Sequence, residues 1–200
     1  MKEIIMATNN AYKLEEVRQI LGDEFLVRGL AEIGCHEDIP ETADSLEGNA
    51  LQKARYVHDH YGFDCFADDT GLEVTALEGG PGVYTARFGA MNGYGESHDA
   101  DANIQCLLDK LEEAEDRSAR FRTVVALVQN GEEHLFEGIV EGEILMQKVG
   151  EGGFGYDPIF APIEADGLAF AQMKAEDKNA ISHRGRAIIK LVEFLKSNYS

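Results

Sequence analysis

Residues 3–21, EIIMATNNAYKLEEVRQIL, form the stretch that decides the fold. Residues 3–7, with their apolar run 4–7, are typical of a short buried strand, and the polar residues 8–10 are of the kind that cap helices. Apolar residues then recur at helical spacing: Leu14, Val17 and Leu21. A strand that passes through a polar turn into a helix is the opening unit of an α/β protein, so we expect that class.

Further helices and strands follow along the chain. Helical spacing of apolar residues predicts a helix over residues 45–60, another around residues 104–111 and a last one that includes residues 188–195. A short apolar strand is predicted at residues 64–67. We expect it to deliver residues 68–71, DDTG, to a turn at its carboxyl end, where α/β sheets place their ligands.

A hairpin is predicted in the second half of the sequence. Asn130-Gly131 separates two runs rich in apolar and β-branched residues, 121–129 and 134–144. This dipeptide between such runs is typical of a type I′ turn. Antiparallel strands therefore join the sheet, and we expect a mixed one.

Composition excludes several classes of protein. The chain has 200 residues, 44% of them hydrophobic, and a formal net charge of −19, which fits one folded domain and disfavours a polymeric nucleic acid as partner. It contains no apolar stretch of the roughly 18 residues that a membrane span needs, and its first residues do not resemble a cleavable leader. The 3 cysteines lack the spacing of a disulfide framework or zinc site, so we expect a cytoplasmic protein.

The adjacent acids Asp68 and Asp69 are the first candidates for chemistry. Two neighbouring carboxylates repel each other unless a cation or a general-base role compensates them. Together with Glu41 they could hold Mg²⁺, which takes one or two protein carboxylates and completes its shell with water and substrate phosphates. The alternative is a polar loop with an Asx turn. The D-x-D-x-T spacing of aspartyl-phosphate phosphatases is absent.

Two further segments have the chemistry of phosphate binding. Residues 8–13 form a strand-to-helix turn whose hydroxyl, amides and backbone N–H groups suit phosphate oxygens, with Lys13 as the cation, although cap residues before a helix are commonplace. Lys178 and residues 182–186, SHRGR, form a basic cluster at the entry to the last helix. It could bind a phosphate or a polar base edge. Alternatively, Ser182 is only an N-cap and the arginines pair with surface acids.

The glycine-rich residues 150–155, GEGGFG, formally match the dinucleotide motif G-x-G-x-x-G. That motif must open a helix, whereas Pro158 pushes the residue before it out of helical geometry, so we reject the dinucleotide interpretation. A flexible turn remains. Phe154 in this turn could stack on a nucleobase or belong to the core. The sequence also lacks a Walker A motif and the H-E-x-x-H and H-x-x-E-H metal patterns.

Taken together and in order, six segments resemble the inosine triphosphate pyrophosphatase family, which removes non-canonical purine nucleoside triphosphates. They span nearly the whole chain, and the last two are highly specific. The matching segments are Ala7-Thr8-Asn9-Asn10 with Lys13; Glu41-Thr42 with Glu47-Gly48-Asn49-Ala50 and Lys53-Ala54; Ala67-Asp68-Asp69-Thr70-Gly71-Leu72; Pro81-Gly82-Val83-Tyr84-Thr85-Ala86-Arg87; Gly152-Gly153-Phe154-Gly155-Tyr156-Asp157-Pro158; and Lys178 with Ser182-His183-Arg184-Gly185.

The resemblance implies an α/β fold with an elongated central mixed sheet flanked by helices, in which two lobes of a single domain, residues 1–200, surround a nucleotide cleft. It also implies a homodimer and a Mg²⁺-dependent hydrolysis of ITP, dITP and XTP to the nucleoside monophosphate and pyrophosphate. A 6-oxo purine would accept hydrogen bonds from donors of the protein, whereas adenine would present another donor. A nucleotide-binding sensor without catalysis and a pyrophosphatase for other modified nucleotides remain open as alternatives.

The resemblance also implies a role for individual residues. Asp69 would be the catalytic acceptor that activates water, and the metal ligands would be Glu41 and Asp69. The residues implied to bind the triphosphate are Thr8, Asn9, Asn10, Ala11, Tyr12, Lys13, Lys53 and Thr70. Those implied to stack on, read or enclose the purine are Phe154, Gly155, Tyr156, Asp157, Lys178, His183 and Arg184.

Two positions depart from the family pattern. Asn9 replaces a glycine, and Thr70 replaces a serine. Asparagine tolerates a left-handed turn and threonine retains the hydroxyl, so we expect activity to survive both changes.

Because the substrate is itself a polyanion, we also expect the basic residues of the candidate segments to reverse the negative electrostatic potential of the protein locally.

Overall fold

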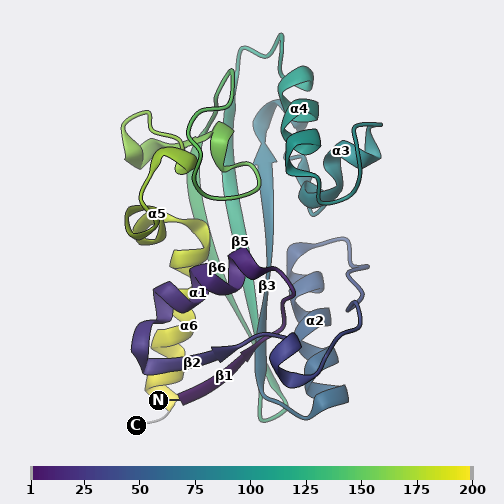
Figure 1. Ribbon diagram of the computed structural model, residues 1–200, viewed down its shortest axis with the longest axis vertical. Coiled ribbons are helices and arrows are strands. Elements are labelled where there is room, and N and C mark those ends of the chain that lie inside the picture. The colour runs from purple at the N-terminus through teal and green to yellow at the C-terminus, as the bar shows by residue number, and fades with distance from the viewer. Residues whose placement is uncertain (1, 199–200) are drawn as a thin grey trace. The chain divides into compact units, whose positions relative to one another are not determined.

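The predicted opening unit is confirmed in the computed structural model, which describes residues 2–198 (Figure 1). Strand β1 (Lys2–Met6) leads through a turn into helix α1 (Ala11–Leu21). The Asn10 side chain caps this helix, because its Oδ1 accepts hydrogen bonds from the backbone N–H groups of Tyr12 and Lys13 at 3.0 and 3.1 Å.

The sheet is mixed, as predicted. Its strands follow the order β2-β1-β3-β5-β6-β7, and β4 pairs with β3. β1 is parallel to both of its neighbours, with Ile4 opposite Val27 and Ile5 opposite Cys65, whereas β4 and β7 are antiparallel to theirs. The remaining strands are β2 (Phe25–Arg28), β3 (Cys65–Val74), β4 (Pro81–Gly82), β5 (Ser118–Gln129), β6 (Glu132–Ile144) and β7 (Phe160–Pro162).

The helices expected from apolar spacing all form. They are α2 (Leu46–Tyr61), α4 (Ala100–Lys110) and α6 (His183–Asn198); two short helices, α3 (Phe88–Met91) and α5 (Ala175–Ile181), were not expected. The hairpin prediction is also confirmed, because Asn130 and Gly131 join β5 to β6 with positive φ angles of 53° and 79°. Over residues 2–198, no helix combines the length and the apolar character that a membrane crossing requires.

The described residues divide into two compact units. Unit 1 comprises residues 1–69, 123–138 and 182–200, and unit 2 comprises residues 70–122 and 139–181. Strands β3, β5 and β6 each contribute residues to both units. The cleft and the single domain over residues 1–200 remain predictions, and residues 1, 199 and 200 lie outside the described part of the chain.

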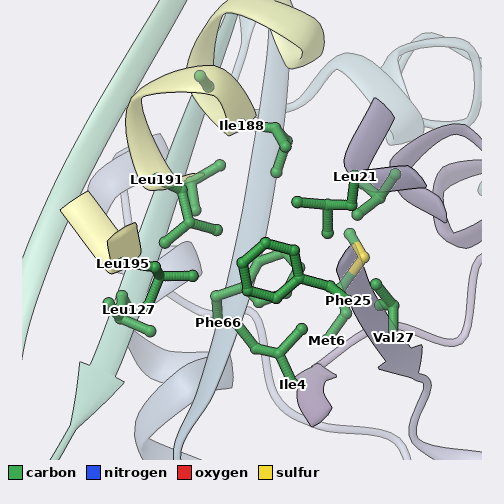
Figure 2. Packing of buried hydrophobic residues seen from close by; sticks show 13 residues of the cluster. Ile4, Met6, Leu21, Phe25, Val27, Phe66, Leu127, Ile188, Leu191 and Leu195 are labelled. Carbon is green, nitrogen blue, oxygen red and sulfur yellow. The ribbon is translucent and has the colours of Figure 1, made fainter. Parts of the chain in front are cut away.

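In unit 1, the two faces of β3 are covered by different helices (Figure 1). Phe66 points into a core that contains residues of α1 and α6, such as Leu21 and Leu191 (Figure 2). Cys65, the preceding residue, points the other way, and its Sγ lies 3.0 Å from the Ala54 carbonyl of α2. Because successive side chains in a strand alternate between faces, the residues of β3 in unit 1, Cys65 to Asp69, are directed in turn to α2 and to α1 and α6.

Unit 2 has its own core. Apolar residues of α4, including Ile104 and Leu107, pack with Phe121 of β5, Phe160 of β7 and the ring of Phe170. The rings of Phe121 and Phe160 meet edge to face, with their centroids 4.6 Å apart. This core supports the glycine-rich loop and the segment that follows it.

Two expectations about loops had different outcomes. The expectation that Asp68 to Gly71 form a turn is wrong, because β3 continues to Val74 and pairs with β4, with Leu72 opposite Gly82. Cross-strand pairing there outweighs the turn preference of Gly71. The rejection of a dinucleotide fold is confirmed: residues 150–155 lead into only a 3-10 turn, Asp157–Ile159, followed by a strand.

Candidate active site

The strand conformation of Asp68 and Asp69 separates the two carboxylates. By the alternation of β3, Asp68 lies on the side of α1 and α6, and Asp69 lies on the side of α2. Neighbouring acids that point to opposite faces repel each other less than a pair in a turn, and each can have its own partners. The pair therefore provides two different carboxylate environments.

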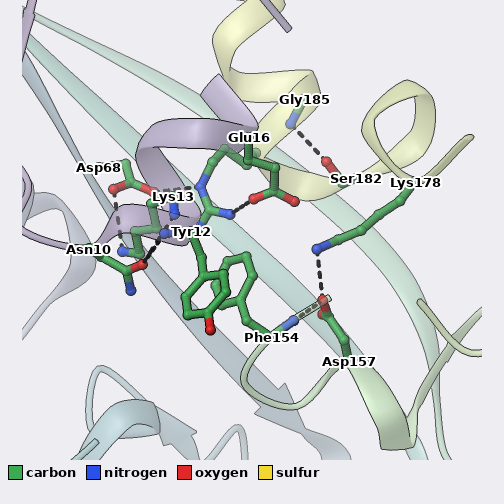
Figure 3. A network of polar contacts seen from close by, with 11 residues as sticks. Asn10, Tyr12, Lys13, Glu16, Asp68, Phe154, Asp157, Lys178, Ser182 and Gly185 are labelled. Carbon is green, nitrogen blue, oxygen red and sulfur yellow. Dashed lines mark hydrogen bonds and ion pairs between the residues drawn. The ribbon is translucent and has the colours of Figure 1, made fainter. Parts of the chain in front are cut away.

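Asp68 belongs to a buried ion-pair network in unit 1 (Figure 3). Its Oδ1 lies 3.3 Å from Lys13 Nζ, and its Oδ2 accepts a hydrogen bond from Arg184 Nε at 2.9 Å. Arg184 also pairs with Glu16 of α1. Burial alone would raise the pKa of Asp68, but the charges of Lys13, Arg184 and Lys53 outweigh it and hold the pKa well below the usual range. Asp68 is therefore an ionised carboxylate whose two oxygens are engaged in ion pairs of unit 1.

Asp69 has the opposite electrostatic character. Burial raises its pKa, and the charges of Glu41 and Asp68 add to that effect, while Lys53 and Lys13 oppose it. A carboxylate whose pKa is raised is a better proton acceptor than an ordinary one. Of the two acids, Asp69 is therefore the one suited to act as a base.

Lys53 of α2 joins Glu41 to the main chain of β3. Its Nζ lies 2.7 Å from Glu41 Oε1 and donates a hydrogen bond to the Asp68 carbonyl at 2.6 Å. Burial would lower the pKa of Lys53, but the charges of Asp69, Glu41 and Asp68 raise it overall, so the ammonium is retained. The loop that carries Glu41 is held to α2, where Asn49 Oδ1 accepts from the Ala43 N–H at 2.9 Å.

The phosphate-loop candidate, residues 8–13, is a capped helix start in unit 1. Thr8 Oγ1 accepts a hydrogen bond from the Asn10 N–H at 3.1 Å, which shapes the turn. Ala11 begins α1, the Tyr12 side chain is exposed and Asn9 is exposed as well. Lys13 is directed to Asp68, and burial lowers its pKa. The prediction that this loop binds a triphosphate stays a prediction.

The base-reading candidate lies in unit 2. Asp157 Oδ2 accepts hydrogen bonds from the Phe154 N–H at 2.9 Å and from Lys178 Nζ at 2.7 Å (Figure 3). The same ammonium lies 4.8 Å from the centroid of the Phe154 ring, within the range of a cation–π contact. Gly153 has a φ of 68°, and a Cβ there would collide with Asp157. Gly155 also has a positive φ, 59°, so the turn requires its glycines.

The basic cluster at the start of α6 has both predicted and unexpected features. Ser182 caps the helix, since its Oγ accepts from the Gly185 N–H at 2.9 Å. The alternative that the arginines pair with surface acids is wrong for Arg184, whose partners Asp68 and Glu16 are buried. His183 is buried as well, where Gly138 lets β6 approach its carbonyl closely. Whether these residues contact a purine stays a prediction.

Sequence reasoning missed two residues that shape these sites, Glu16 and Thr85. Glu16 lies three positions after Lys13 and so faces the same side of α1, the one signal that could have found it. Thr85 has no signal of its own in the sequence beyond its place in the segment Pro81 to Arg87. In unit 2, the Tyr156 hydroxyl donates a hydrogen bond to the Thr85 carbonyl at 2.7 Å. Thr70 follows Asp69 in β3 and is half-buried.

These features define an α/β protein in which carboxylates of the central strand β3 pair with cations from the flanking helices. A sequence model described as the Ham1 family matches residues 4–194, and the chain belongs to this family. It is 53% identical over 196 residues to a dITP/XTP pyrophosphatase of Porphyromonas gingivalis, with 98% of each chain covered. It is 43% identical over 201 residues to the enzyme of the same name from Bacillus subtilis, again with 98% of each covered.

The fold is also similar to a solved structure. The Staphylococcus aureus Ham1 protein superposes with a TM-score of 0.85 at 39% identity, covering 98% of this chain and 100% of that one. The expected fold class and the expected family are therefore confirmed.

Proposed function

We propose that this protein hydrolyses non-canonical purine nucleoside triphosphates, namely dITP, ITP and XTP, to the nucleoside monophosphate and pyrophosphate. The names of its relatives and its membership of the Ham1 family support the reaction class. One observation in the structure carries the mechanism: two adjacent acids have opposite electrostatic roles. Asp68 is kept ionised by Lys13 and Arg184, while the pKa of Asp69 is raised.

In the proposed reaction, water adds to phosphorus and the anhydride bond between the α and β phosphates breaks. Asp69 orients this water and accepts its proton, and its side chain lies on the α2 face of β3, apart from the ion pairs of Asp68. Lys53 and Lys13 place positive charge near the acids, where they stabilise the charge that develops on the phosphate oxygens. Thr8 to Lys13 and Thr70 bind the triphosphate, and the turn at Phe154 to Asp157 binds the base with Lys178, His183 and Arg184.

The balance of charge among the ionised side chains around Asp68 and Asp69 in unit 1 favours the binding of a divalent cation. Three cations, Lys13, Lys53 and Arg184, face four carboxylates, Glu16, Glu41, Asp68 and Asp69. A group with more carboxylates than cations does not by itself attract a polyanionic triphosphate.

Within the described residues, no three acidic, histidine or cysteine side chains are arranged as a metal site. Mg²⁺ needs only one or two protein carboxylates beside water and phosphate, so Glu41 and Asp69 fit it as ligands. When bound, Mg²⁺ would neutralise phosphate charge.

Product analysis tests the proposal. The protein is incubated with Mg²⁺ and ITP, XTP, ATP or GTP, and the products are separated by ion-exchange chromatography. We expect IMP or XMP with pyrophosphate, and little turnover of ATP and GTP. Release of orthophosphate, or equal turnover of all four, would contradict the reaction. Selective turnover of a modified pyrimidine nucleotide instead would favour the broader pyrophosphatase function.

Variants separate catalysis from binding. We expect Asp69→Asn to reduce kcat by about 10²–10⁴-fold, the usual contribution of a general base, while ITP affinity is retained. Asp101→Asn, at an exposed acid that pairs with Lys148, is the matched control and should keep full turnover. A wild-type protein that binds ITP without turnover would instead be a nucleotide sensor.

We also propose a homodimer and a cytoplasmic location. The family resemblance supports the dimer, and light scattering after size-exclusion chromatography measures it directly. The buried cysteines Cys35, Cys65 and Cys106, none of them in a disulfide, fit a reducing compartment.

A further inference from the structure

The segment Pro81 to Arg87 resembles the family pattern, yet the proposed reaction gives it no role. It forms strand β4 (Pro81–Gly82) and then a 3-10 turn, Thr85–Arg87. Thr85 at the start of that turn is only 8% exposed, although its neighbours Tyr84 and Ala86 are exposed. A buried hydroxyl between two exposed residues needs hydrogen-bond partners, and these partners indicate its role.

The side chain of Thr85 binds the segment to β3. Its Oγ1 accepts a hydrogen bond from the Leu72 N–H at 2.9 Å and donates one to the Gly82 carbonyl at 2.5 Å. Leu72 lies two residues beyond Thr70 in the same strand and is fully buried. The position of Thr85 is therefore fixed relative to the part of β3 that carries Thr70.

The main chain of Thr85 binds the other candidate segment of unit 2. Its carbonyl accepts the hydrogen bond from the Tyr156 hydroxyl at 2.7 Å. Tyr156 is 5% exposed, its ring belongs to the unit 2 core, and it stands between Phe154 and Asp157 in the base-reading turn. One residue thus contacts both the strand of the phosphate-binding candidate Thr70 and the turn of the base-binding candidates.

Asn103 of α4 holds the chain just beyond Thr85. Its Oδ1 accepts from the Gly89 N–H at 2.7 Å, and its Nδ2 donates to the Ala86 carbonyl at 3.1 Å. Asn103 is itself buried. The segment is therefore anchored on both sides of Thr85, and it cannot shift without breaking buried hydrogen bonds, which are costly to leave unmade.

We propose that Thr85 is a positioning residue for purine recognition, an inference that rests on the proposed function. It contacts no substrate. It fixes the base-reading turn relative to the strand that carries Thr70, so that this turn and Thr70, both in unit 2, keep one spacing. Loss of the Thr85 contacts should therefore affect the discrimination between bases more than the hydrolytic step at Asp69.

Two variants test the two sides of this connection. Thr85→Val removes the hydroxyl and keeps the shape of the side chain, and Tyr156→Phe removes the hydroxyl that reaches the Thr85 carbonyl and keeps the buried ring. For each, kcat and KM are measured with ITP and with ATP. We expect KM for ITP to rise about tenfold, and the ratio of kcat/KM for ITP over ATP to fall by a similar factor, the usual effect of a lost buried hydrogen bond.

Control variants exclude a general loss of stability. Thr85→Ser keeps the hydroxyl and should restore the ITP-to-ATP ratio of the wild type. Tyr94→Phe removes a tyrosine hydroxyl that donates to Asp109 Oδ2 at 2.8 Å elsewhere in unit 2, and it should leave the ratio unchanged. If Thr85→Val fails to fold, Asn103→Ala takes its place, because it removes the hydrogen bond to the Ala86 carbonyl and Asn103 is not among the residues proposed to bind the base.

The outcomes distinguish this inference from the proposed function. A ratio that is unchanged in both variants, with turnover of ITP and ATP reduced equally, would mean that Thr85 has only a structural role and would overturn the inference. Rescue of the ratio by Thr85→Ser supports it. Failure of the wild-type protein to release pyrophosphate from ITP would instead overturn the proposed function and, with it, this inference.

Discussion

Replacing the two adjacent acids one at a time should separate stability from activity. Asp68→Asn removes the charge that Lys13 and Arg184 both contact, at 3.3 and 2.9 Å, in a part of unit 1 where Asp68 and Arg184 are each 1% exposed. Arg184 then retains its ion pair with Glu16. Asp69→Asn removes a charge that burial already disfavours, as its raised pKa indicates.

The two substitutions should have very different energetic costs. Breaking a buried ion pair by removing one partner costs about 3–5 kcal/mol, because the other charge remains buried without compensation. For a protein of this size, that corresponds to a Tm lowered by roughly 6–20 °C. Asp69→Asn keeps the shape of the side chain, and we expect the free energy of unfolding to change by no more than about 1 kcal/mol.

Urea unfolding followed by circular dichroism at neutral pH, with no divalent metal present, measures both free energies, and steady-state hydrolysis of ITP measures activity. We expect Asp68→Asn to be strongly destabilised and Asp69→Asn to be nearly as stable as the wild type but inactive. Equal destabilisation by both substitutions would refute the assignment of separate roles. Retained activity in Asp69→Asn would refute it as well.

Three further predictions concern other parts of the chain. Gly138→Ala should lower the Tm by several degrees in a thermal melt, because its Cβ would collide with the His183 carbonyl, and Gly142→Ala should act likewise through the carbonyl of Ala161. Hydrogen bonds, chiefly from Tyr61, lower the pKa of Glu37 from 4.5 to about 2. They therefore stabilise the fold above pH 4.5, and this contribution is lost as the pH falls towards 2. The Tm difference between the wild type and Tyr61→Phe should shrink over that range. Chelation with EDTA should abolish ITP turnover and excess Mg²⁺ should restore it, whereas turnover that persists in EDTA would exclude a required divalent metal.

Much of the fold could be predicted from the sequence because its signals are local. Helical spacing identified α1, α2, α4 and α6, and the Asn130-Gly131 dipeptide identified the hairpin. The short strands β2 and β7 went unnoticed, since runs of four and three residues carry no periodic signal. The end of β3 was misjudged because its pairing with β4, which is not local, decides whether the chain turns at Gly71.

The site was predictable as a set of residues but not as a set of contacts. The family resemblance named Asp68 and Arg184, yet their hydrogen bond joins positions 116 residues apart, and Glu16 and Arg184 are 168 residues apart. No local pattern indicates such pairs. Asp68 and Asp69 have different partners because side chains alternate between the two faces of a strand. The sequence predicted a turn at these residues, so this alternation could not be inferred from it.

The same contacts change the interpretation of the net charge of −19. The sequence suggested that basic residues in the candidate segments reverse the local potential, but Lys13, Lys53 and Lys178 each lie within 3.3 Å of a carboxylate oxygen. Charges that are already paired attract a triphosphate weakly. We therefore propose that a bound divalent cation supplies the positive potential for the substrate, and that the carboxylates of unit 1 that exceed its cations in number hold this cation.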